Sequence, residues 1–337
     1  MQQFVCGFYW ALSDLQACPE CSTWHYETIT QGKKLITVPC KQALTIPVRP
    51  QILAQYRSPE SVWNMGHHNR FMDPLVANIH AGGSIDIYND VYCSLTLLNP
   101  AICRDLTPND TVLMLSINST QLFESKQSDC WIYIWVLLDL APDLHYKKKY
   151  VLPRGFIPGP SKPKNLGSFM YTGLHHLSAL QQEGLHFWDC HTGHVFTSHP
   201  FFFLGTANGP GLAALHGQVG HHGAFGCHKY CGLRGQHKPG GPHYYPALLK
   251  PMDYALPGCN HNDVDIYKLP KASPGQYYKN LDSLLACQSD TQFKLTWKET
   301  GLCKPSIFLG IDQWYLSSLP GCLAINRPYA CNRHQSP

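Results

Sequence analysis

Hydrophobic positions gather near the middle of the chain in continuous runs that predict β-strands. Residues 111–118, TVLMLSIN, are almost entirely apolar or β-branched and follow a Pro-Asn-Asp turn signal. A second strand is expected at 121–124. A third is expected at 130–140, CWIYIWVLLDL, which is rich in aromatic and β-branched residues. The centre of the chain therefore predicts a β-sheet.

Helical spacing of apolar residues alternates with these strands. Leu174, Leu177 and Leu180 recur at helical intervals within 167–184, and Gly184 is suited to end that helix. Further elements are a helix over 58–82 that Ser58-Pro59-Glu60 introduces, a fourth strand over 194–206 that Pro200 breaks or places at an edge, and a short helix over 211–216. The order of these elements predicts an α/β fold with a mixed sheet.

Four regions follow from this pattern. Residues 1–57 form a cysteine-bearing N-terminal segment, and 58–110 form a helical linker region. The sheet core covers 111–232. Residues 233–337 are rich in proline, glycine and histidine and predict irregular structure with one helix near 277–287.

Composition narrows the class of protein. The 337 residues are 44% hydrophobic and 14% charged, which is typical of a globular chain rather than a disordered one. A formal net charge of +4 is a mild basic bias and gives weak support for a polyanionic partner. An odd number of cysteines, 15, and an N-terminus without a signal-peptide pattern favour an intracellular protein with thiols free or bound to zinc.

Histidine and cysteine cluster in one glycine-rich segment. His222, Cys227 and Cys231 have the side chains that zinc prefers, so a structural zinc site is expected there. The fourth ligand is open, with His221, His216, His228 or a remote cysteine as candidates. The alternative is a glycine-rich loop that holds one or two buried thiols.

A second cysteine pair lies near the N-terminus. Cys18 and Cys21 have the spacing of half a zinc ribbon, and Cys40 or His25 would have to complete the site because no second Cys-x2-Cys occurs. The alternative is a cysteine pair without a function.

Basic residues cluster in two places and could contact the phosphates of a nucleic acid. The candidates are Lys148, Arg154, Lys162, Lys164, Arg234 and Lys238. A solvated charged surface is the competing interpretation. No nucleophile elbow, P-loop or dinucleotide-binding fingerprint occurs, so no motif indicates a hydrolase.

Several long blocks, in the same order, resemble the transposases of fungal CACTA-like (En/Spm-type) DNA elements. They are TVLMLSINSTQLFESKQSDCWIYIW, YKKKYVLPRGFIPGPSKPKNLGSFMY, TANGPGLAALHGQVGHHGAFGC and HKPGGPHYYPALLKP. The resemblance implies an RNase H-like core, a DNA partner, Mg²⁺ chemistry at three acidic residues, and a nuclear location. The family pattern ends soon after residue 326, which implies a truncated copy.

The acidic positions of that family are amides in this chain. Asn118 stands within Ser-Ile-Asn-Ser where the family has Ser-Ile-Asp-Gly, Asn208 stands within Ala-Asn-Gly-Pro where it has Ala-Asp-Gly-Pro, and Asn326 occupies the third position. Mg²⁺ prefers anionic oxygen ligands, and each Asp-to-Asn change removes one charge beside it. The expectation is a transposase-derived protein that is inactive as a nuclease. Asp139 is the fallback acid, and a non-enzymatic zinc-stabilised interaction module is the alternative function.

Overall fold

The computed structural model describes most of the chain, with gaps. It covers residues 14–19, 22–40, 42–103, 105–121, 124, 129–159, 163, 165–227, 230–237, 240–245, 247–249, 263–269, 274–309 and 311. The chain divides into two compact units, one made of 1–202 with 311–313 and the other of 203–310 with 314–337. No described helix is long and apolar enough to cross a membrane.

A five-stranded mixed sheet, four of whose strands lie in the first unit, confirms the predicted α/β class. Its strand order is β3 (Leu44–Thr45), β6 (Leu152–Pro158), β5 (Asp129–Leu137), β4 (Val112–Gln121) and β9 (Phe201–Ala207). The pairs β3–β6, β6–β5 and β5–β4 are antiparallel. β9 starts beside the start of β4, where the Phe201 N–H donates to the Thr111 carbonyl at 2.7 Å. Four of the first five residues of β4 are buried, and exposure begins at Asn118.

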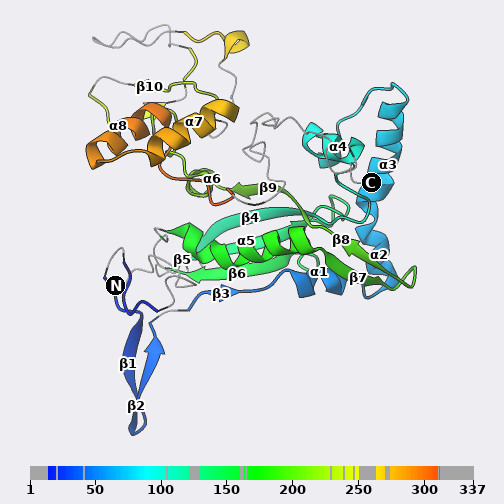
Figure 1. Cartoon of the computed structure of the whole chain (residues 1–337), viewed down its shortest axis with the longest axis horizontal. Helices are drawn as coiled ribbons and strands as arrows, with labels where there is room; N and C mark the ends of the chain where they lie inside the picture. The colour runs from blue at the N-terminus through cyan, green and yellow to red at the C-terminus, as the bar shows by residue number, and fades with distance from the viewer. Residues whose placement is uncertain are drawn as a thin grey trace, which may run out of the picture. The chain divides into compact units, whose positions relative to one another are not determined.

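Helix α5 (Leu166–Glu183) lies across the strands β4, β5 and β6 (Figure 1). Asn165 caps its first turn by accepting the Ser168 N–H at 3.1 Å, and it ends at Gly184, whose φ of 78° favours glycine. The predicted leucines are buried, and the Tyr133 hydroxyl of β5 donates to the Phe169 carbonyl at 3.4 Å. The helix predicted from leucine spacing is therefore confirmed.

The helical region before the sheet is more divided than the sequence predicts. The single helix expected over 58–82 is two helices, α2 (Pro59–Met65) and α3 (His67–His80), separated at Gly66. They are preceded by α1 (Arg49–Gln55) and followed by a one-turn 3-10 helix (Val91–Cys93) and α4 (Leu95–Ile102). Ser58 caps α2 by accepting the Ser61 N–H at 3.2 Å, so the predicted entry is confirmed.

Three strand predictions change. The run expected at 194–206 is two strands, because β8 (His194–Ser198) ends before Pro200 and pairs with β7 (Leu185–Asp189) in a separate two-stranded sheet. β4 continues to Gln121, so the strand expected at 121–124 is not separate. Residues 154–158, for which no strand was expected, belong to β6.

The N-terminal segment and the second unit contain further helices and strands. A hairpin of β1 (Tyr26–Gln31) and β2 (Lys34–Pro39) lies in the N-terminal segment. The second unit holds α6 (Gly209–His216), β10 (Gln236–His237), β11 (Tyr244–Tyr245), a 3-10 turn (Ile266–Lys268), α7 (Pro274–Leu285) and α8 (Asp290–Thr300). Tyr277, Leu281, Leu284 and Leu302 form a small core there. The described part of the region expected to be irregular thus includes the predicted helix, as α7, and a further helix, α8, that was not predicted.

Candidate functional site

Asn118 is the first exposed residue of β4 after its buried stretch. It lies opposite Ile132 of β5 in the antiparallel register. Because side chains alternate along a strand, the buried Ile117 points into the core while Asn118 points to the other face. The first of the three family positions is therefore an exposed amide on a central strand of the sheet.

Asn208 occupies the junction between β9 and α6. Its Oδ1 accepts the Gly211 N–H at 2.9 Å, so the amide caps the helix. An added Cβ at Gly211 would lie 2.8 Å from the Ala207 Cβ and 2.9 Å from the Asn208 Oδ1, so the Asn-Gly-Pro-Gly turn has no room for a side chain there. An aspartate at 208 could make the same cap, and its charge would suit the helix N-terminus.

Asn326 lies outside the described residues, as do Cys21, Lys162, Lys164 and Lys238. Asn118 belongs to the first unit and Asn208 to the second. That the two amides face one another stays a prediction.

Asp139, the fallback acid, is buried just beyond the end of β5, and its side chain is 3% exposed. One carboxylate oxygen accepts the Val112 N–H at 3.0 Å, and the other lies 3.5 Å from His68 Nδ1. Burial raises the pKa of Asp139, and the hydrogen bond and charge of His68 oppose that rise. Both oxygens have partners inside the fold, where the carboxylate joins the start of β4 to α3.

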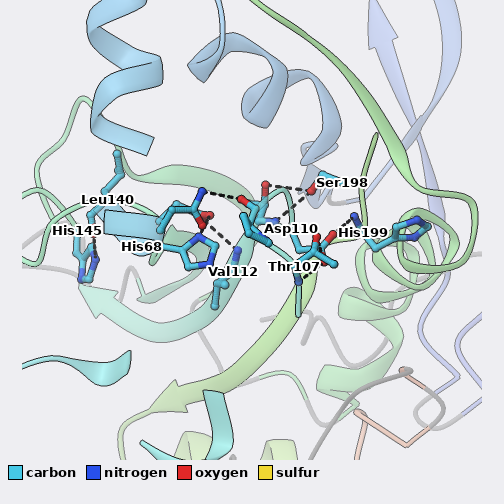
Figure 2. Close-up of polar contacts among 12 residues, drawn as sticks. His68, Thr107, Asp110, Val112, Leu140, His145, Ser198 and His199 are labelled. Carbon is cyan, nitrogen blue, oxygen red and sulfur yellow. Dashed lines mark hydrogen bonds and ion pairs between the residues drawn. The ribbon is translucent and has the colours of Figure 1, made fainter. Parts of the chain in front are cut away.

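A second buried carboxylate extends this arrangement, as Figure 2 shows. Asp110 accepts the Thr107 N–H and hydroxyl, each at 2.8 Å, through one oxygen, and the His199 N–H at 2.7 Å through the other. Beside it the Ser198 hydroxyl accepts the Thr111 N–H at 3.0 Å. Pro108-Asn109-Asp110 was predicted as a turn, but no sequence pattern indicated that Asp139 and His68 would lie in the same region.

A pocket of about 250 Å³ lies beside the His68–Asp139 pair. Residues in its lining include Tyr56, His68, Asp139, Asp189, His194 and Phe196. The Tyr56 ring packs against Phe187 and Phe196 at centroid distances of 4.5 and 5.4 Å. Burial, followed by the nearby charge of Asp139, raises the pKa of Tyr56. The hydroxyl therefore stays protonated, and the wall of the pocket is a neutral phenol beside carboxylates.

The cysteine–histidine segment forms two separate groups of contacts, one between two thiols and one among three histidine rings. Cys227 Sγ and Cys231 Sγ lie 3.1 Å apart as free thiols. The His222 ring lies 3.9 Å from that of His221 and 4.5 Å from that of His243, measured between centroids. Among the residues that the structure describes, no three His, Cys, Asp or Glu side chains are arranged to hold a metal ion. The zinc site at His222, Cys227 and Cys231 stays a prediction.

The structure describes only some of the residues suggested as the fourth zinc ligand. His216 is buried in α6 and packs against the Phe308 ring at 5.9 Å, while His228 lies outside the described residues. In the N-terminal segment Cys18 is buried and the Cys40 thiol donates to the Trp24 carbonyl at 3.4 Å. With Cys21 undescribed, the half zinc ribbon also stays a prediction.

The basic candidates divide by exposure. Lys148 and Arg234 are exposed, and the Arg234 guanidinium lies 5.9 Å from the centre of the Tyr244 ring. Arg154 requires a correction, since it is only 2% exposed. Its guanidinium donates to the Ile46 carbonyl and lies against Gly173 of α5. A side chain enclosed in this way holds β6 to its neighbours and does not reach a phosphate.

Comparison with known proteins adds no relative. No protein-family model matches the chain, and no curated protein matches it. Any function assigned to the chain therefore rests on its own sequence and geometry.

Proposed function

We propose that this chain is a transposase-derived, DNA-binding protein with an RNase H-like sheet that does not cleave DNA. The observation that carries the proposal is the place of the two amides. Asn118 lies where β4 becomes exposed, and Asn208 directly follows β9. In the family that the chain resembles, aspartates are expected at both places.

The order of the strands supports this proposal. Three antiparallel strands, β4, β5 and β6, are followed by α5 and then by β9, which starts beside β4 at the Phe201–Thr111 hydrogen bond. An RNase H-like sheet has this sequence of strands and helix, with its metal-binding acids on the two neighbouring central strands. The β7–β8 hairpin is an addition between α5 and β9.

The absence of negative charge on the two amides explains the expected loss of cleavage. A pair of Mg²⁺ ions, as in the family, would activate the attacking oxygen and stabilise the leaving one. Asparagine offers one neutral carbonyl oxygen, whereas Mg²⁺ favours carboxylates. Since each 1.4 kcal/mol of lost transition-state stabilisation slows a reaction about tenfold, two such changes in one site would abolish useful cleavage.

DNA binding would use the exposed cations instead. Lys148 and Arg234 are exposed and can contact phosphates, which requires no metal. A nuclear location follows from this proposal. Structural zinc at His222, Cys227 and Cys231 stays the prediction from the sequence, and metal analysis of the purified chain decides between it and a free pair of thiols.

The test measures nicking of a supercoiled plasmid with Mg²⁺ or Mn²⁺, together with Mn²⁺ affinity from electron paramagnetic resonance. The native chain is expected neither to nick the plasmid nor to bind Mn²⁺ measurably. Asn118→Asp with Asn208→Asp is expected to bind Mn²⁺ and to recover nicking. Asn165→Asp is the matched control, because Asn165 also caps a helix but lies at α5.

Two results would count against the proposal. Nicking by the native chain would show that other acids serve. A double variant that folds but binds Mn²⁺ no better than the Asn165→Asp control would show that positions 118 and 208 do not form a metal site.

A further inference from the structure

We infer that Cys227 and Cys231 are a redox-active pair. A small disulfide such as oxidised glutathione would oxidise the two thiols to a disulfide bond between Cys227 and Cys231. This inference concerns the second unit alone and does not rest on the proposed function. It would hold whether or not the chain binds DNA.

The separation of the sulfurs is the first argument. Cys227 Sγ and Cys231 Sγ are 3.1 Å apart, and the Cys231 S–H donates to the Cys227 sulfur. Two thiolates bound at about 2.3 Å to one tetrahedral zinc ion would lie about 3.8 Å apart. A disulfide needs about 2.05 Å. The pair is thus closer than zinc would hold it, and about 1 Å of further approach would form the bond.

The backbone around Cys231 keeps the two sulfurs together. Tyr230 has a φ of 52° and Gly232 a φ of 74°, so the residues on both sides of Cys231 are in the left-handed region. For tyrosine this conformation is unfavourable and has to be held by its surroundings. The turn is closed by the Tyr230 N–H, which donates to the Cys227 carbonyl at 2.9 Å.

Contacts of the Tyr230 side chain stabilise this left-handed conformation. Its hydroxyl accepts the Asn280 Nδ2–H of α7 at 2.6 Å, and its ring meets the Tyr277 ring edge-on at 5.3 Å. Tyr230 also packs on the small core of the second unit. Helix α7 therefore fixes the turn that brings Cys227 and Cys231 together.

Small reagents can reach the pair. Both thiols are half-buried, and they line a pocket of about 300 Å³ whose other walls include Phe225, Asn280 and Glu299. The pocket is large enough for one arm of a small disulfide. Among the described cysteines, Cys93 and Cys130 are buried and offer no such approach.

The hydrogen bond between the thiols assigns their roles. The Cys231 S–H is directed at the Cys227 sulfur, so Cys231 is placed to attack Cys227 once Cys227 has reacted with the small disulfide.

The reaction has two exchange steps. Cys227 thiolate attacks one sulfur of oxidised glutathione, which breaks the glutathione disulfide and releases one glutathione thiolate. Cys231 thiolate then attacks the Cys227 sulfur and releases the second glutathione. The protein loses two electrons and two protons, and both glutathione molecules leave as thiols.

Peptide mapping tests the inference on the full chain. Between Lys164 and Arg234 trypsin can cut only after Lys229, so Cys227 falls in peptide 165–229 and Cys231 in peptide 230–234. After incubation with oxidised glutathione and alkylation of remaining thiols, these two peptides are expected to be joined, and dithiothreitol should separate them. Cys227→Ser and Cys231→Ser should each abolish the link. Cys231→Ser should trap glutathione on Cys227.

Peptide 165–229 also contains Cys190, so Cys190→Ser is the control and should retain the link. A link lost in Cys190→Ser would overturn the inference. It would also be overturned by one zinc ion per purified chain that blocks oxidation until a chelator removes it, or by thiols that stay alkylatable in excess oxidised glutathione. The thermal unfolding curve of each reduced variant shows whether it is folded, and the trapped Cys231→Ser adduct gives a second readout.

Discussion

His68 Nδ1 lies 3.5 Å from the Asp139 carboxylate, and both side chains are enclosed by the fold. The His68 N–H also donates to the Asp139 carbonyl at 3.3 Å, so backbone and side chain both join the start of α3 to the end of β5. The His68 ring stacks on Tyr92 at 5.3 Å. A buried pair of this kind is costly to break, because removing one partner leaves the other without compensation.

Asp139→Ala is therefore expected to destabilise the first unit strongly. Removing the carboxylate leaves the buried Val112 N–H and the His68 ring without their acceptor, and each buried group left unsatisfied lowers the free energy of unfolding by about 1–3 kcal/mol. Asp139→Asn should cost less, because its carbonyl oxygen can still accept the Val112 N–H. Guanidinium denaturation measures both. Equal losses in the two variants would show that the hydrogen bond to Val112 contributes nothing.

The same carboxylate predicts a dependence of stability on pH. Burial raises the pKa of Asp139 in the folded chain, so the folded state binds a proton more tightly than the unfolded state. The Asp139 contribution to stability is then most favourable at low pH and declines as pH rises from about 4 through the folded pKa. Asp139→Asn should remove this decline. The control is Asp143→Asn, because Asp143 is exposed. Parallel stability curves for the native chain and Asp139→Asn would contradict the prediction.

Position 173 is expected to tolerate only glycine, because the Arg154 side chain packs directly against it. A Cβ at position 173 would collide with the guanidinium of Arg154, which is buried and cannot swing away. Gly173→Ala should lower the free energy of unfolding by about 1–3 kcal/mol through overpacking, although alanine favours helix. Thr172→Ala, at an exposed neighbouring position of α5, should be neutral or slightly stabilising. Thermal unfolding of both variants checks this, and similar melting temperatures would refute it.

Asn208 should stabilise the fold as the cap of α6, whether or not the proposed function is correct. Asn208→Ala removes the acceptor of the Gly211 N–H and should cost about 0.5–2 kcal/mol. Asn208→Asp keeps the acceptor and adds a charge that suits the helix N-terminus, so its stability should equal or exceed that of the native chain. Urea denaturation compares the three. A destabilised Asn208→Asp would indicate that nearby negative charge opposes a carboxylate there.

Under the proposed function, DNA binding should depend more on Lys148 than on the neighbouring lysines. Lys147 lies 3.3 Å from Asp143 and Lys149 lies 4.0 Å from Glu60, while no ion pair of Lys148 occurs among the described residues. Lys148→Ala should weaken binding of a short duplex and reduce the slope of log affinity against log salt by about 1. Lys147→Ala is the matched control and should have a smaller effect. Fluorescence anisotropy over a salt series gives both slopes, and equal slopes in all three proteins would exclude Lys148 as a phosphate contact.

Local pattern was sufficient where burial is continuous or a single residue ends an element. The apolar run at 112–117 is a buried strand, Gly184 ends α5, and Pro200 separates β8 from β9. These features depend on residues that are neighbours in sequence. Local chemistry therefore predicted them.

Other features depend on partners far along the chain. β6 contains Pro153, Gly155 and Pro158, which are poor strand formers, yet it pairs on both sides with β5 and β3. Gly155 is needed because a side chain there would collide with the Tyr133 ring. The His68–Asp139 pair likewise joins residues of different regions, and no motif links them in sequence. Tertiary contact decided these cases, which is why the sequence pattern did not predict them.

The pairing of β3 determines when the N-terminal part can join the sheet during synthesis. Ile46 donates its N–H to the Arg154 carbonyl at 2.7 Å and accepts from the Arg154 guanidinium across 108 residues of chain. β4 and β5, in contrast, are consecutive strands that pair from Leu113 to Gln121. Closing the longer loop costs more chain entropy and requires β6 to have left the ribosome. We therefore expect β4 and β5 to pair first, and residues 44–46 to join the sheet only after β6 has been synthesised, more than a hundred residues later.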